Sequence, residues 1–218
     1  MSTQIMKTMA ANAALEHVTE DCILGVGTGS TVNCLIEELK KIKSKIRATV
    51  ASSLQTEKIL KDSGFNVIEL NQVDNLDLYI DGADAYNEFK QLVKGGGGAL
   101  TREKIIATAA EKFICIVDES KKATVLGKFP VAIEVIPMAR SFVARQIVGL
   151  KGQPILREGF ITDNNNVILD VHNWIIEQPL SLEREVNSIP GVVCHGIFAL
   201  RPADQVIIGH KTSVSYIN

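Results

Sequence analysis

The chain has 218 residues, of which 46% are hydrophobic and 22% charged, as in a globular protein with a substantial core. Its 23 basic and 25 acidic residues give a net charge of -2, which excludes the strongly basic surface that binds nucleic acid. Residues 1–14 contain no long apolar run, so we expect neither a signal peptide nor a membrane span, and a cytoplasmic location.

The first half of the chain alternates between helix and strand patterns. Hydrophobic spacing predicts a helix over 5–18, a strand over 22–26, a helix over 32–39, a strand over 46–51, a helix ending at Gly64, strands over 67–70 and 76–80, a helix over 101–112 and a strand over 113–117. This order predicts a mostly parallel sheet covered by helices on both faces. Ligands of such sheets bind beyond the carboxyl ends of the strands, where we expect residues 27–31, 81–84 and 94–98.

The second half has a different order of elements. The pattern predicts strands over 131–136, 154–161, 167–171 and 192–199, with helices over 139–150 and 181–188. This is the β-α-β-β-α-β order of a ferredoxin-like fold, and a last strand over 205–209 returns to the first sheet. We therefore predict an α/β protein with a Rossmann-like domain over 1–126 and 203–218, and a smaller ferredoxin-like α+β domain over 127–202.

A glycine-rich turn, GVGTGST at 25–31, follows a strand and opens a helix. Its glycines allow a ligand close to the backbone, the helix start favours phosphate, and Thr28, Ser30 and Thr31 add hydroxyl groups. A capped turn without a ligand would use the same residue types. A dinucleotide fingerprint is incomplete, because Ser30 replaces its third glycine and the next strand ends without an acid, and no P-loop is present.

Two more segments place polar groups at the same predicted edge. Asp81 and Asp84 directly follow a strand, and two such carboxylates can accept hydrogen bonds from hydroxyls and transfer protons in one cleft, although Asx turns also favour them. Lys94 precedes four glycines at 95–98. Because a glycine run costs backbone entropy, a ligand pressed against bare backbone explains it better than a linker does.

Glu103 lies in the first turn of the helix that Thr101 is expected to cap. A glutamate there is favoured by the helix dipole alone, so the pattern leaves a structural and a catalytic role open. The four histidines are far apart in the sequence and form no metal-binding spacing with one another or with cysteine. We therefore predict no metal site.

Together these segments resemble the ribose-5-phosphate isomerase A family over nearly the whole chain. The motifs that carry the resemblance, in order, are GVGTGSTV at 25–32, DGAD at 81–84, KGGG at 94–97, LTREK at 100–104, FICI at 113–116, VIPMAR at 135–140, TDN at 162–164, NVILD at 166–170 and IPGVV at 189–193. The resemblance implies reversible conversion of D-ribose 5-phosphate to D-ribulose 5-phosphate in the pentose phosphate pathway, without metal or organic cofactor. It also implies a homodimer, or in some members a tetramer.

The resemblance further implies a set of site residues. Glu103 matches the family's proton acceptor, and Asp81, Asp84 and Lys94 match groups that line the reacting end. Matching substrate-binding positions are Lys7, Thr28, Gly29, Ser30, Thr31, Asp81, Gly82, Ala83, Asp84, Lys94, Gly95, Gly96, Gly97 and Lys121. We hypothesise that Asp81 assists ring opening, that Glu103 moves a proton between C2 and C1 through a cis-enediolate, and that Lys94 with the glycine N–H groups stabilises the negative oxygen.

The sequence departs from the family pattern at two places. Ala85 stands where the family often has Glu, and Gly98 where it often has Ala, which leaves the polarity and flexibility of two loops open. Two other classes of function fit a fold of this kind. A sugar-phosphate sensor would not need the acids and Lys94, and an acyl-CoA transferase would use a glutamate nucleophile.

Overall fold

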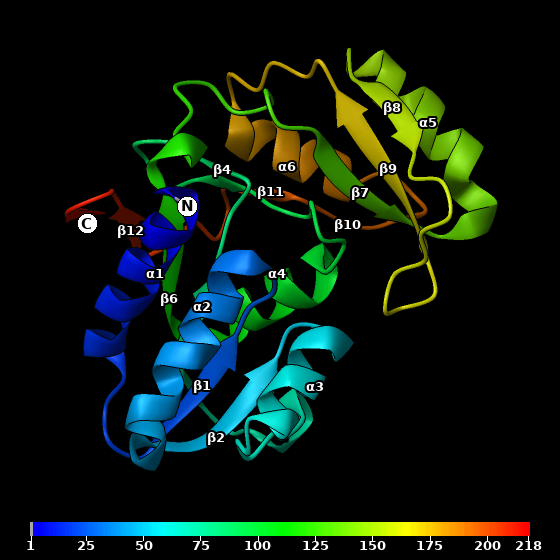
Figure 1. The fold of residues 1–218 in the computed structure, drawn as a ribbon. Helices are drawn as coiled ribbons and strands as arrows, with labels where there is room; N and C mark the ends of the chain where they lie inside the picture. The colour runs from blue at the N-terminus through cyan, green and yellow to red at the C-terminus, as the bar shows by residue number, and fades with distance from the viewer. Residues whose placement is uncertain (1) are drawn as a thin grey trace. The chain divides into compact units, whose positions relative to one another are not determined.

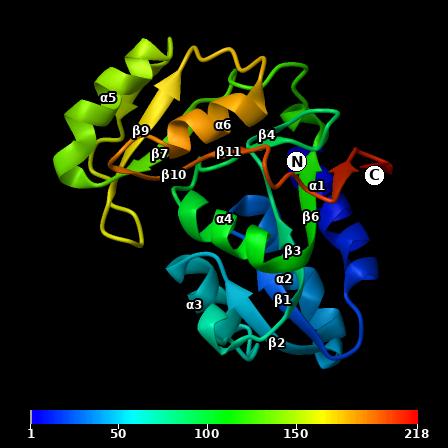
Figure 2. The same ribbon diagram turned by 180° about the vertical axis from the view of Figure 1, so that it is seen from behind.

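Figures 1 and 2 show a computed structural model that describes residues 2–218. The chain forms two compact units. The first comprises the chain up to Ala83, Arg102–Lys121 and Ala203–Asn218, and the second comprises Asp84–Thr101 and Lys122–Pro202. Within residues 2–218, no helix combines the length and the apolar character that crossing a bilayer requires.

A six-stranded, mostly parallel sheet forms the centre of the first unit. Its strands are β1 (Cys22–Val26), β2 (Ile46–Ala51), β3 (Leu76–Asp81), β6 (Ala110–Asp118), β12 (Gln205–Gly209) and β13 (Val214–Ile217). Their spatial order is β13-β12-β6-β3-β1-β2, and only the β12–β13 pair is antiparallel. The predicted return of residues 205–209 to the first sheet is confirmed.

The strand order changes direction at β1, which lies between β2 and β3. After β1 the chain continues to β2 on one side, and after β2 it crosses back to β3 on the other side of β1. The connections from β1 and to β3 therefore run to opposite sides. Such a switch point opens a crevice beyond the carboxyl ends of the two strands. Val26 and Ile80 are register partners there, and the N–H of Gly27 donates to the carbonyl of Ile80 at 2.9 Å. The segments after Val26 and after Ile80 therefore lie side by side.

Helices cover both faces of this sheet. They are α1 (Ser2–Ala14), α2 (Ser30–Leu39), α3 (Leu54–Asp62) and α4 (Leu100–Ala109). The views from the two sides show α1 and α2 together on one face, and α3 and α4 on the other (Figures 1 and 2). Leu35 and Leu39 of α2 pack with Leu24, Ile80 and other apolar strand residues in the main core, whose burial stabilises the layered arrangement.

The second unit is built on a four-stranded antiparallel sheet. Its elements are β7 (Val131–Val135), α5 (Arg140–Gly149), β8 (Gln153–Leu156), β9 (Val167–His172), α6 (Pro179–Asn187) and β10 (Val192–His195). The order β10-β7-β9-β8 places the first and third strands side by side, which is the split β-α-β arrangement predicted from the sequence. Val143 and Ile147 of α5 and Val186 of α6 pack in one core with apolar residues of β7 and β9.

A small second sheet completes this unit. It consists of β4 (Ala85–Tyr86), β5 (Leu92–Val93) and β11 (Ile197–Phe198), all antiparallel. Because β5 pairs with β11 and β4 pairs with β5, residues 84–101 group with the second unit, whereas the sequence pattern assigned them to the first domain. Residues 122–126 also group with the second unit.

Several strands differ from the prediction, which contained neither β4 nor β5 and extended β8 to residue 161. Residues 67–70 were predicted as a strand but form only a single bridge between Val67 and Thr49. The predicted strand over 192–199 is two strands, β10 and β11, which belong to different sheets. Strand β13 follows the last strand that the sequence pattern indicated.

Candidate active site

The glycine-rich turn after β1 has the geometry of an anion site. Helix α2 begins at Ser30, directly after Gly29, whose φ of 118° is a conformation that glycine adopts without strain. The ammonium group of Lys7 on α1 donates to the hydroxyl of Ser30 at 2.8 Å. The structure thus brings a positive charge to the start of α2, where the helix dipole also favours an anion.

Asp81 at the end of β3 holds this turn in place from the neighbouring strand. Its side chain is buried, and Oδ1 accepts hydrogen bonds from the N–H of Thr28 at 3.1 Å and of Gly82 at 2.7 Å. Oδ2 accepts a hydrogen bond from the hydroxyl group of Tyr79. A Cβ atom at Gly27 would lie 1.9 Å from Oδ1 of Asp81, so the close approach requires glycine at this position.

Glu103 reaches the same neighbourhood from α4. It lies in the first turn of the helix and is 4% exposed. Ile106, one turn later on the same face, packs against β1, since a Cβ atom at Gly25 would lie 2.8 Å from both Ile106 and Tyr79. Burial, followed by the negative charges of Asp81 and Glu103, raises the pKa of Tyr79 well above its usual value. Asp81 and Glu103 therefore both act on one phenol.

In the second unit, Asp84 and the glycine loop are joined by a direct contact. Oδ2 of Asp84 accepts the N–H of Gly96 at 2.8 Å. The guanidinium group of Arg157 donates to the carbonyls of Gly95 at 3.1 Å and Gly96 at 3.3 Å. Arg157 is fixed in turn by a bidentate pair with Asp170 at 2.5 and 2.8 Å. These hydrogen bonds hold the loop through its backbone atoms. Gly96 and Gly97 remain exposed.

Lys94 is held just before this loop. Its side chain is only 3% exposed, and Nζ lies 5.7 Å from the centre of the Phe198 ring. Its backbone N–H donates to the carbonyl of Gly196 at 2.8 Å. A Cβ atom at Gly196 would lie 2.0 Å from the carbonyl oxygen of Lys94, so a bare backbone is needed for this approach. A buried ammonium near an aromatic face is a pre-oriented positive charge.

Gly98, one of the two departures from the family pattern, has a structural explanation. Its φ is 82°, and a Cβ atom there would lie 2.2 Å from the ring of Phe160. Alanine at this position would have to strain the backbone and displace the ring. The other departure, Ala85, is buried as the first residue of β4, where it packs in the apolar core of the second unit.

The remaining predicted site residues are distributed as follows. Thr31 is half-buried in the first turn of α2, and Gly82 and Ala83 are half-buried directly after Asp81. Lys121 is half-buried at the end of η4 (Glu119–Lys121), which follows β6 at the carboxyl edge of the sheet. Within residues 2–218, Lys121 makes no side-chain hydrogen bond to another predicted site residue.

A cluster of hydroxyl side chains beside Thr28 was not predicted as part of the site. The Thr28 hydroxyl lies 2.8 Å from that of Ser52, 2.9 Å from that of Ser53 and 3.2 Å from that of Thr56. Thr56 in turn donates to the carbonyl of Gly27 at 2.8 Å. The sequence signal is the pair Ser52–Ser53 directly after the strand over 46–51, a position that is also typical of a helix cap. Ser53 does cap α3, because its hydroxyl accepts the N–H of Thr56.

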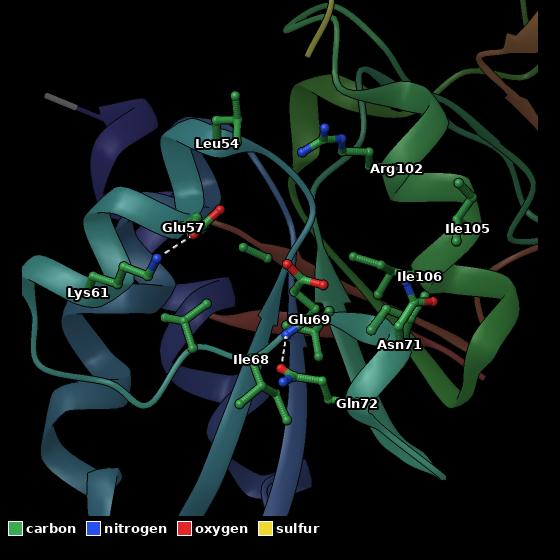
Figure 3. A pocket seen from close by; sticks show the side chains of 14 residues that line it. Leu54, Glu57, Lys61, Ile68, Glu69, Asn71, Gln72, Arg102, Ile105 and Ile106 are labelled. Carbon is green, nitrogen blue, oxygen red and sulfur yellow. Dashed lines mark hydrogen bonds and ion pairs between the residues drawn. The ribbon is translucent and has the colours of Figure 1, made fainter. Parts of the chain in front are cut away.

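A cavity of about 840 Å³ lies elsewhere in the first unit (Figure 3). Figure 3 shows Arg102 and Ile105 of α4 on one side of it, and Glu57 and Lys61 of α3 on the other. Glu57 and Lys61 form an ion pair at 2.5 Å. None of the predicted site residues lines this cavity. The cluster around Asp81 lies outside this cavity and is the better candidate.

Thr101 was expected to cap α4, but it lies inside the helix. The helix begins one residue earlier, and the Thr101 hydroxyl donates to Glu134. Glu134 is buried and also accepts hydrogen bonds from Thr162 at 2.8 Å, Asn166 at 2.8 Å and Asn164 at 3.2 Å. This carboxylate thus anchors the turn at 162–166 and the start of α4 to β7. These contacts give the buried carboxylate a structural role.

A Glu134→Ala variant should lose stability, because four donors, two of them buried, would lose their acceptor. We expect a loss on the order of 3 kcal/mol in the free energy of unfolding, measured by urea denaturation. Glu158→Ala, which removes an exposed carboxylate in the same unit, is the control and should change stability by less than about 0.5 kcal/mol. Equal losses in both variants would contradict the anchoring role.

The chain is similar to known proteins over most of its length. Residues 48–213 match the family model described as ribose 5-phosphate isomerase A (phosphoriboisomerase A). The chain is 60% identical over 208 residues to the ribose-5-phosphate isomerase A of Francisella tularensis subsp. novicida strain U112, which covers 95% of this chain and 93% of that protein. Among solved structures, that of ribose 5-phosphate isomerase A from Neisseria gonorrhoeae has a TM-score of 0.97, 46% identity, and coverage of 100% and 98%.

A second solved structure is that of a D-ribose-5-phosphate isomerase in complex with phospho-erythronic acid. It has a TM-score of 0.94 and 39% identity, and the match covers 99% of each chain. The fold is thus that of an α/β isomerase. The chain belongs to the ribose-5-phosphate isomerase A family, which interconverts ribose 5-phosphate and ribulose 5-phosphate.

Proposed function

We propose that Glu103 is the base that carries the proton between C2 and C1 of the substrate, through a cis-enediolate. The observation that carries this proposal is the convergence of two buried carboxylates, Asp81 and Glu103, on Tyr79 at the carboxyl edge of the sheet. A buried carboxylate whose orientation is fixed in advance is suited to proton transfer at carbon. Asp81 assists ring opening at the sugar hydroxyls, and Glu103 serves both carbons in turn.

The phosphate group of the substrate binds at the start of α2. Three features support this proposal: the exposed Gly29 and Ser30, the free N–H groups of a helix start, and the Lys7 ammonium at 2.8 Å from Ser30. The solved relative that holds phospho-erythronic acid, a phosphorylated sugar acid, supports a ligand of this class. Gripping the phosphate fixes the distant reacting carbons, which lowers the entropic part of the barrier. Lys121 is a further cation for the substrate.

Residues of the second unit stabilise the negative charge that develops on oxygen. Lys94 supplies the positive charge, the backbone N–H groups of the loop at 95–98 supply further donors, and Asp84 positions substrate hydroxyls. The contacts of Arg157 with the carbonyl of Gly95, and of Gly196 with the backbone of Lys94, support this role. Donors that are already oriented need no reorganisation during the reaction.

The direct test of this reaction is an assay of purified protein with ribose 5-phosphate in the presence of a metal chelator, monitored for formation of the ketose. We expect turnover to be unaffected by the chelator, because the proposed chemistry uses only protein side chains. Loss of turnover on chelation, restored by a divalent cation, would contradict the proposal that no metal is required.

A Lys7→Ala variant should raise the KM for ribose 5-phosphate by about tenfold, because a charge-assisted contact to phosphate is lost. The effect should shrink at high ionic strength, since Lys7 is only half-buried and its charge is screened. Lys58→Ala, which removes an exposed cation paired with Asp62, is the control. An unchanged KM for Lys7→Ala would place the phosphate elsewhere.

We further propose a homodimer that acts in the cytoplasm, in the pentose phosphate pathway. The family membership supports this proposal. Light scattering of the purified protein at micromolar concentration tests the oligomeric state, and a mass of one 23.7 kDa chain would contradict it.

A further inference from the structure

Tyr79 occupies a central position that the reaction scheme above does not use. It lies two residues before Asp81 on β3, so both side chains point to the same face of the sheet. The residue is fully buried, and its ring stacks on that of Phe113 with the ring centres 5.1 Å apart. This packing places the phenol oxygen, the only polar atom of the side chain, within hydrogen-bond distance of Oδ2 of Asp81.

The direction of this hydrogen bond is fixed by chemistry. A carboxylate can only accept, so the phenol must donate. Burial, followed by the charges of Asp81 and Glu103, raises the pKa of Tyr79 well above its usual value, so the phenol is protonated at neutral pH. Tyr79 is therefore a permanent donor. Ser52, whose side chain also acts on the pKa of this phenol, belongs to the hydroxyl cluster around Thr28.

We propose that Tyr79 is a positioning residue for isomerisation, which orients the Asp81 carboxylate toward the sugar and links it to the turn that binds the phosphate. The inference rests on the role proposed above for Asp81. The two N–H groups of Thr28 and Gly82 fix Oδ1, but they alone leave the carboxylate able to tilt about that oxygen. The phenol fixes the second oxygen, so both ends of the carboxylate are held before substrate binds.

A link through Tyr79 also connects two parts of the substrate site. The phenol donates to Asp81, and Ser52, which also acts on the pKa of the phenol, has its hydroxyl 2.8 Å from that of Thr28. Thr28 also donates its backbone N–H to Asp81. The turn and the acid are therefore held together, and a change at the phenol should disturb Asp81 first.

Tyr79→Phe tests the proposal, because it removes one oxygen and keeps the stacked ring. We expect kcat to fall by about ten- to a hundredfold with KM changed by less than about twofold, as for loss of one hydrogen bond to a charged group. In an Asp81→Asn background the same change should lower kcat no further, because the carboxylate it positions is gone. Unchanged kcat in Tyr79→Phe, or an equal fall in both backgrounds, would overturn the proposal.

The controls separate this inference from the proposed function. Thr49→Val removes another buried hydroxyl, on β2, that donates to the carbonyl of Asn66 at 3.1 Å, and it should lower the melting temperature but leave kcat unchanged. Normal turnover in Asp81→Asn alone would instead refute the role of Asp81. If Tyr79→Phe does not fold, Ser52→Ala provides the same test, with a smaller fall in kcat expected in the wild-type background and none in Asp81→Asn.

Discussion

A Glu103→Gln variant is expected to lose about 10²–10⁴-fold in kcat, with little change in KM for ribose 5-phosphate. Glutamine has the shape of glutamate but cannot take a proton from carbon at neutral pH. Glu103 is 4% exposed, so water is not positioned to replace it as a base. The measurement is steady-state turnover in both directions, since one base is proposed to serve both carbons. The loss should therefore be similar in the two directions.

Glu111→Gln is the matched control for this prediction. It makes the same chemical change in the same unit, at an exposed residue that hydrogen-bonds Asn75. Its turnover should equal that of the wild type. If Glu103→Gln keeps near-normal turnover, the base must be sought elsewhere, and Asp81 is then the next candidate because it acts on the same phenol.

Gly27→Ala should damage both stability and catalysis. The new methyl carbon would lie 1.9 Å from Oδ1 and 2.0 Å from Cγ of Asp81, so the carboxylate must move and give up its bonds to Thr28 and Gly82. Overpacking of this kind costs about 1–3 kcal/mol, and displacing a group at the reacting end by about 1 Å lowers the rate by about 10²-fold. Urea denaturation and kcat measure the two effects.

Gly149→Ala is the corresponding control, because a Cβ atom at Gly149 in the last turn of α5 meets nothing within 4 Å. It should be neutral or stabilise the protein by up to about 1 kcal/mol, with unchanged kcat. A Gly27→Ala enzyme with normal kcat would show that the position of Asp81 does not matter to the reaction.

Much of the fold could be predicted, because local signals and packing agree over most of the chain. The strand at 22–26 has the predicted bounds, since five buried apolar or small residues lie between Asp21, with a φ of 59°, and the glycine-rich turn. Prediction failed where distant contacts decide. The apolar run at 192–199 is one stretch in sequence, but it divides at Gly196, where the backbone of Lys94 approaches.

The candidate site was also predictable only in part, and again the local signals could be recognised while the distant contacts could not. Acids and glycines at strand ends were visible in the sequence, because their types and positions indicate chemistry without further information. The contributions of Tyr79, Ser52 and Arg157 were not visible. Tyr79 reads as an ordinary core residue of a buried strand, and Arg157 reaches the carbonyl of Gly95 from a segment about sixty positions away. Such supporting contacts depend on tertiary packing, on which local patterns carry no information.

Strand β12 has a consequence for how the chain is made. It is the parallel neighbour of β6, yet it lies after the whole second unit in the sequence. During synthesis, β6 with its apolar residues Ile114 and Ile116 is complete long before residues 205–209 emerge, and until then it is a bare edge strand. A nascent or prematurely terminated chain that ends before Ala203 would therefore be prone to aggregate, and intact chains depend on their last strands to close this edge.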